Sequence, residues 1–156
     1  MLNIEQFREL IVKSTLNDLQ LYSKNAEELL IFTCATESMG GTYLKQIKGP
    51  ALGIYQMEPN TYNDIWQNYL KFNMSIVMKF MTSFHVAFMP PEERMIYDLR
   101  FATAMARFHY RRVDEPLPPH DNIGAIWEYY KKYYNTPLGK ADREHSIKQY
   151  ELFVGC

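Results

Sequence analysis

Apolar residues recur at helical spacing along most of the chain. Ile4, Phe7, Leu10 and Ile11 fall on one helical face, and Asn3 precedes them as a capping residue. Strict alternation of apolar and polar residues, which is typical of half-buried strands, is almost absent. The pattern therefore predicts a mainly helical chain.

Six further helical stretches follow the first one, separated by residues that favour turns. Asn25 with Glu28 resembles a capping box at the start of the second helix, and Asn60 or Thr61 is expected to cap the third. The expected helices cover about 25–38, 60–70, 76–84, 91–112, 123–134 and 142–153.

The segment 42–55 is the least helical part of the chain, and a short hairpin is compatible with it. Five glycines and prolines lie between residues 40 and 53, which is the densest group of helix breakers in the sequence. There is no internal repeat or convincing linker. We therefore expect one all-α, or mainly α, domain over residues 1–156, with about six or seven helices.

Charge and composition exclude several classes of protein. With 47% apolar residues the chain can bury a core, so disorder is not expected. The net charge of −1 gives no electrostatic case for a nucleic-acid-binding protein. Basic residues do gather locally, and they predict either solvated helix faces or a surface that faces a polyanion. These residues are Arg107, Arg111, Arg112, Lys131 and Lys132.

Metal, cofactor and membrane signals are also missing from the sequence. The two cysteines and four histidines show no metal-ligand spacing, so we expect neither a metal nor a cofactor. The first residues are partly acidic, unlike a signal peptide, and the apolar region 76–89 is too interrupted to span a membrane. We expect a monomer that is made in the cytoplasm without a signal peptide.

Glu37 is the residue whose position indicates chemistry. It stands at the end of an apolar helix, directly before the glycine-rich stretch. A carboxyl near the negative pole of a helix and shielded from water has a raised pKa. A carboxylic acid that stays protonated near neutral pH can donate its proton to a leaving oxygen.

Two short motifs surround this glutamate. Residues 35–38 read Ala-Thr-Glu-Ser, and residues 53–59 read Gly-Ile-Tyr-Gln-Met-Glu-Pro, which places Gln56 nineteen positions after Glu37. The pair resembles the motifs of soluble lytic transglycosylases and of their goose-type lysozyme relatives, although Tyr55 replaces the usual methionine. The resemblance implies a lysozyme-like fold, with Glu37 as the catalytic residue and Ser38, Tyr55 and Gln56 as substrate contacts.

A third motif, Tyr133-Tyr134-Asn135, resembles a stretch in which the family aims a tyrosine hydroxyl at the catalytic glutamate. That match favours Tyr134, and Tyr129 and Tyr130 remain alternatives, since Tyr130 and Tyr134 share a helical face. The resemblance adds Tyr130, Tyr134 and Asn135 to the expected substrate contacts. Residues 75–89 match no part of the family pattern.

The resemblance implies cleavage of peptidoglycan between N-acetylmuramic acid and N-acetylglucosamine. No acid lies between Ser38 and Met57, which favours a one-carboxylate lytic transglycosylase. Two alternatives stay open: a hydrolytic lysozyme (endolysin) that uses Glu58 as a second carboxylate, or an inactive lysozyme-like virion or cell-wall-binding protein. The expected setting is bacteriophage lysis, with a holin or the virion delivering the protein to the wall.

Overall fold

The computed structural model describes residues 1–155, so Cys156 lies outside the described part. Within residues 1–155 the chain forms eight continuous helices and one short 3-10 turn, and no strand is present there. The elements are α1 (Ile4–Gln6), η1 (Phe7–Lys13), α2 (Ser14–Asp18), α3 (Lys24–Ser38), α4 (Pro59–Asn68), η2 (Leu70–Phe72), α5 (Met74–Phe84), α6 (Arg94–Tyr97), α7 (Leu99–Arg111), α8 (Ile123–Tyr130), η3 (Lys131–Asn135) and α9 (Arg143–Val154). The predicted all-α fold class is confirmed.

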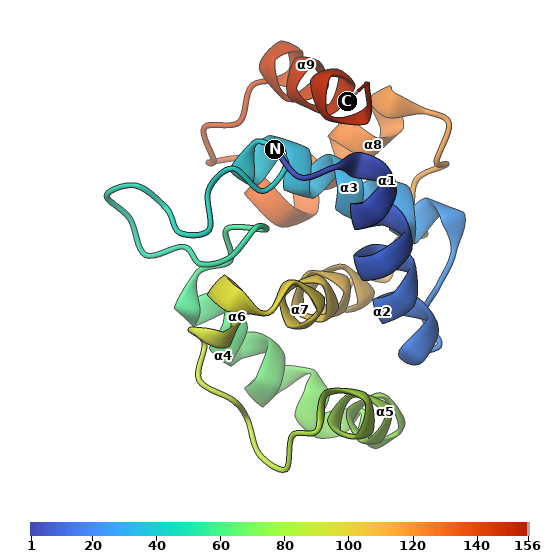
Figure 1. The fold of residues 1–156 in the computed structure, drawn as a ribbon, viewed down its shortest axis with the longest axis vertical. Coiled ribbons are helices and arrows are strands. Elements are labelled where there is room, and N and C mark those ends of the chain that lie inside the picture. The colour runs from blue at the N-terminus through green and yellow to red at the C-terminus, as the bar shows by residue number, and fades with distance from the viewer. Residues whose placement is uncertain (156) are drawn as a thin grey trace.

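Helix α3 runs through the middle of the molecule. Figure 1 shows α8 and α9 on one side of it and α7 on the other, with α4 and α5 beyond α7. Ten residues in succession, from Ala26 to Ala35, are buried, so α3 has no solvated face over that length. A helix that is apolar nearly all round belongs inside a domain, which explains its central place.

A cluster of aromatic rings joins α4 and α5 to α7. Phe80 of α5 stacks on Phe101 of α7 at 5.6 Å between ring centroids, and it meets Phe108 edge to face at 5.1 Å. Trp66 of α4 packs on Phe80 at 5.7 Å. These contacts bury one side of α4 and α5 against α7.

The loop 39–58 contains two isolated bridges, Lys45 with Leu52 and Leu52 with Met57, in place of the hairpin considered above. Gly53 turns the chain with a φ of +75°. A Cβ at this position would lie 2.3 Å from the carbonyl oxygen of Met95, so only glycine fits against α6. This close approach holds the segment that contains Gln56 against the helical body.

Three predicted helix boundaries were wrong. Ser23, and not Asn25, caps α3 by accepting a hydrogen bond from the N–H of Ala26 at 3.0 Å. Helix α4 begins at Pro59 without a side-chain cap, so neither Asn60 nor Thr61 serves as one. The expected helix 91–112 divides at Asp98, whose extended backbone and side chain end α6 and cap α7.

None of the described helices is long and apolar enough to cross a membrane.

Candidate active site

Glu37 is the next-to-last residue of α3 and lies in the wall of a cleft with a volume of about 980 Å³. The cleft runs between the end of α3, the loop before α4, and the segments around η3 and α9. It brings together most of the predicted site residues. Those in its lining are Glu37, Gln56, Glu58, Tyr130, Tyr134 and Asn135.

The carboxyl group of Glu37 is partly buried and accepts one hydrogen bond, from the hydroxyl of Tyr130 at 2.5 Å. Burial raises the pKa of Glu37 to about 7, and the hydrogen bond from Tyr130 acts in the opposite direction. No cation forms an ion pair with Glu37 within residues 1–155. The carboxyl is therefore divided between its acid and base forms near neutral pH.

The tyrosine that contacts Glu37 is Tyr130, so the preference for Tyr134 was wrong. Tyr134 donates its hydroxyl proton to the backbone oxygen of Tyr55 at 2.7 Å, and Tyr129 donates to the backbone oxygen of Glu115 at 2.9 Å. Tyr130 and Tyr134 stack with ring centroids 6.1 Å apart. Tyr134 lies in the wider π-helical turn η3, which a spacing rule for α-helices does not describe.

Ser38 and Tyr55 were expected to contact substrate, but the structure turns both away from the cleft. The Ser38 hydroxyl is fully buried, where it donates to the Cys34 carbonyl at 3.1 Å and accepts from the Gly41 N–H at 3.0 Å. It closes the end of α3. The Tyr55 side chain is 1% exposed. Its aromatic ring therefore belongs to the core.

Gln56 and Asn135 both line the cleft, and one side-chain atom of each is engaged in hydrogen bonds. Gln56 donates from Nε2 to the Gly53 carbonyl at 2.8 Å. Asn135 accepts from Lys131 Nζ at 2.8 Å. Each retains amide donors or acceptors that no described residue uses, and such groups suit the hydroxyl and acetamido groups of a sugar. Glu58 is exposed at the rim of the same cleft.

His109 of α7 lines the cleft too, and the sequence analysis did not single it out. Arg112 can only donate, so the 2.8 Å contact makes Nδ1 of His109 an acceptor, and Nε2–H donates to the Tyr133 carbonyl at 3.0 Å. Burial, with help from Arg112, lowers the pKa of His109 to about 4. Its ring meets Tyr134 edge to face at 4.8 Å. A single histidine on a helix has no spacing pattern in the sequence that would have predicted its place in the cleft.

Asp142 and His145 complete the far side of the cleft. Asp142 caps α9, accepting from the N–H of His145 at 2.9 Å. No group of three or more potential metal ligands is present in the described part of the chain. No family model, curated protein or solved structure matches this chain.

Proposed function

We propose that this protein cleaves the glycan strands of peptidoglycan at the β-1,4 bond between N-acetylmuramic acid and N-acetylglucosamine. The observation that carries the proposal is the Glu37 carboxyl, which faces a large cleft and has a pKa of about 7. Such a group is half protonated at neutral pH, so it can both give and take a proton. The resemblance of residues 35–38 and 53–59 to lytic transglycosylases supports the choice of substrate.

In the proposed reaction Glu37 first donates its proton to the glycosidic oxygen, and the bond from that oxygen to C1 of N-acetylmuramic acid breaks. The leaving sugar departs with a free hydroxyl. Glu37, now a carboxylate, then removes the proton from the C6 hydroxyl of the muramic acid. The C6 oxygen attacks C1 and closes a 1,6-anhydro ring, so Glu37 ends protonated and no water is consumed. One carboxyl is sufficient for this route.

Tyr130 has a defined part in this scheme. Its hydroxyl is the donor to Glu37 and favours the carboxylate form that exists between the two proton transfers. Burial of Glu37 has the opposite effect and favours the acid form. The balance of the two places the pKa where the same group can serve as acid and base.

Hydrolysis is the second candidate, and one observation favours it. Glu58 lies at the rim of the cleft that contains Glu37, so a second carboxylate is available to position water. If hydrolysis is the reaction, E58Q and E37Q should each abolish activity. The one-carboxylate route predicts that E58Q keeps most of the activity.

The proposal is tested by clearing of peptidoglycan suspensions and by mass spectrometry of the released muropeptides. We expect wild type to release 1,6-anhydro products and E37Q to lose activity by about 100-fold or more. E5Q, at an exposed glutamate in α1, is the control and should match wild type. Reducing-end products would favour hydrolysis, whereas binding to peptidoglycan without any cleavage by wild type would favour an inactive wall-binding or virion protein.

The substrate lies outside the cytoplasmic membrane, so delivery belongs to the proposal. A holin that opens the membrane, or a virion that carries the protein, would bring a phage lysis enzyme to the wall. Expression in the cytoplasm with and without a membrane-permeabilising protein tests this. We expect lysis only when the membrane is opened.

A further inference from the structure

Arg107 of α7 is a buried cation to which the described part of the chain offers no carboxylate partner. Arg107 is 7% exposed, and its Nε donates a hydrogen bond to the backbone oxygen of Leu21 at 3.3 Å. Within residues 1–155 it forms no ion pair. Burial, and then the nearby charge of Arg111, lowers the pKa of Arg107 to about 10. A buried guanidinium in this position is costly unless an anion accompanies it.

Two further side chains surround this guanidinium. Arg111 lies one helical turn after Arg107, is exposed, and forms no ion pair with any described residue. Tyr69 is partly buried, which raises its pKa, and Arg111, Arg107 and Arg112 all lie near enough to oppose that rise. Arg107, Arg111 and Tyr69 form what is called here the arginine–tyrosine cluster.

Two acidic residues close to this cluster in the sequence pair with other cations. Asp64 pairs with Arg112, and Glu115 pairs with Lys132 at 3.0 Å. Arg107 and Arg111 are therefore left with two positive charges that no described carboxylate neutralises. Like charges one turn apart on a helix repel each other, so the protein holds this pair at an energetic cost.

The cluster is distinct from the cleft that contains Glu37. Residues two positions apart on an α-helix point about 200° from each other. His109 lines the cleft, so Arg107 and Arg111 of the same helix face the opposite side, toward Leu21 and Tyr69. The sequence analysis noted these arginines, and the proposed glycan cleavage does not use them.

We propose that the arginine–tyrosine cluster binds a phosphate group. A tetrahedral phosphate has oxygens enough to accept from both guanidinium groups and from the Tyr69 hydroxyl, and its negative charge offsets the unpaired arginines. Planar guanidinium groups are the usual partners of phosphate in proteins. The same chemistry is presented by free phosphate and by a lipid headgroup, so the two sources need separate measurements.

The first measurement is isothermal titration of wild type with inorganic phosphate, against chloride at equal ionic strength. Arg111 is exposed, so its replacement should not disturb folding. We expect R111Q to weaken phosphate binding about tenfold or more. R143Q removes the same charge from an exposed position at the start of α9 and should bind phosphate like wild type. R107M should also lose binding. Equal affinity in R111Q, R143Q and wild type, or no heat beyond that of chloride, would overturn the proposal.

The second measurement is cosedimentation with vesicles of phosphatidylcholine, with and without phosphatidylglycerol. Binding to the anionic vesicles that R111Q loses and R143Q retains would assign the site to a lipid headgroup. Binding of inorganic phosphate without vesicle binding would assign it to a diffusible phosphate. If neither probe distinguishes R111Q from R143Q, the cluster is only a solvated pair of cations and the proposal is wrong.

Discussion

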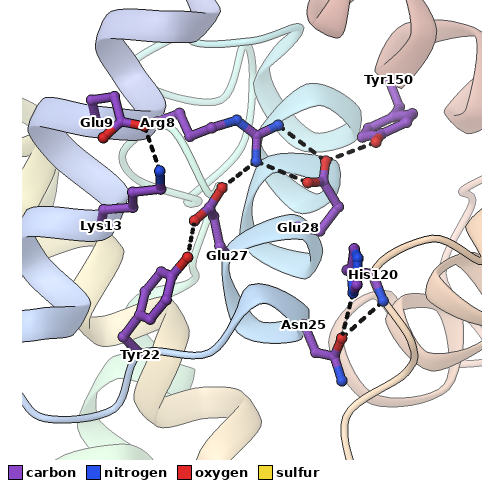
Figure 2. A network of polar contacts seen from close by, with 9 residues as sticks. All are labelled: Arg8, Glu9, Lys13, Tyr22, Asn25, Glu27, Glu28, His120 and Tyr150. Atoms are coloured by element: carbon purple, nitrogen blue, oxygen red, sulfur yellow. Dashed lines mark hydrogen bonds and ion pairs between the residues drawn. The ribbon is translucent and has the colours of Figure 1, made fainter.

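Helix α3 carries glutamates at its two ends in opposite surroundings. Near its start, Glu27 and Glu28 are 1% and 7% exposed, and Arg8 of η1 forms ion pairs with both, at 2.8 Å for Glu28. Figure 2 shows the Arg8 guanidinium between the two carboxylates. Near the end of the helix, Glu37 pairs with no cation among residues 1–155, and its one hydrogen bond from these residues comes from Tyr130.

Further donors strengthen the first site. Tyr22 donates to Glu27 at 2.8 Å and Tyr150 donates to Glu28 at 2.7 Å, as Figure 2 also shows. The positive pole of the helix lies at this end as well. The comparison teaches that burial alone does not decide the chemistry of a carboxyl. The more deeply buried glutamates hold α1–α2 and α9 against α3, and the less buried Glu37, left without a cation, acquires a pKa suited to proton transfer.

The largest effect on stability is expected from R8M. This change leaves Glu27 and Glu28 buried side by side without their shared cation, so like charges face each other in the interior. Loss of one partner of a buried pair costs about 3 kcal/mol or more of unfolding free energy. Urea unfolding at neutral pH measures it. K13M is the control, because Lys13 pairs with Glu9 on the surface, and it should change stability little. A loss in R8M as small as in K13M would contradict this account of the network.

E37Q is expected to stabilise the protein at high pH. The pKa of Glu37 is raised in the folded state to about 7 from an ordinary value of 4.5. The folded state therefore binds the proton more tightly, and the stability that this contributes is present below pH 4.5 and lost as the pH rises to 7. Glutamine removes this dependence. Above pH 7 the variant should be more stable by roughly 3 kcal/mol, and below pH 4.5 the two proteins should be alike.

Unfolding free energies measured across this pH range test the sign. E28Q is the mirror experiment at the other end of α3, because it removes a paired carboxylate and should destabilise at neutral pH. Parallel stability curves for wild type and E37Q would mean that the Glu37 carboxyl is solvated like an ordinary surface acid. The proposed acid–base role would then lose its electrostatic basis.

The unequal success of the sequence analysis follows from the same comparison. Glu37 was predicted from local signals, a helix end and a glycine-rich stretch that directly follow one another. The Arg8 network was not predicted, because its partners lie 19 and 20 residues apart and share no pattern. Ser38 and Tyr55 were assigned to a motif by their position in the sequence alone. Tertiary packing decides where a side chain points, and both point inward.

Y130F should change the pH dependence of activity. Phenylalanine keeps the ring and removes the only hydrogen bond from a described residue that favours the Glu37 carboxylate. The pKa of Glu37 should therefore rise further. The alkaline limb of the pH–activity profile reports loss of the acid form, so it should move to higher pH by about one unit. The measurement is the initial clearing rate of peptidoglycan as a function of pH.

Y134F is the matched control for this shift. Tyr134 stacks on Tyr130, but its hydroxyl donates to the Tyr55 carbonyl and not to Glu37. Its loss should lower stability by about 1 kcal/mol and leave the alkaline limb in place. If Y134F moves the limb as far as Y130F does, then the sequence-based preference for Tyr134 describes the functional contact better than the hydrogen bond to Tyr130.

The smallest effect is expected at the cap of α3, where S23A and N25A separate two interpretations of its start. Ser23 accepts from the Ala26 N–H at 3.0 Å, so S23A should cost about 1 kcal/mol and speed hydrogen exchange of that amide. Asn25 instead accepts from the backbone N–H of His120 at 2.9 Å, which joins α3 to the loop before α8 (Figure 2). N25A should therefore speed exchange at His120 and leave Ala26 protected. The opposite result would be faster exchange at Glu28 or Ala26 in N25A but not in S23A. It would restore the capping box expected from the sequence. The helix that presents Glu37 would then begin two residues later.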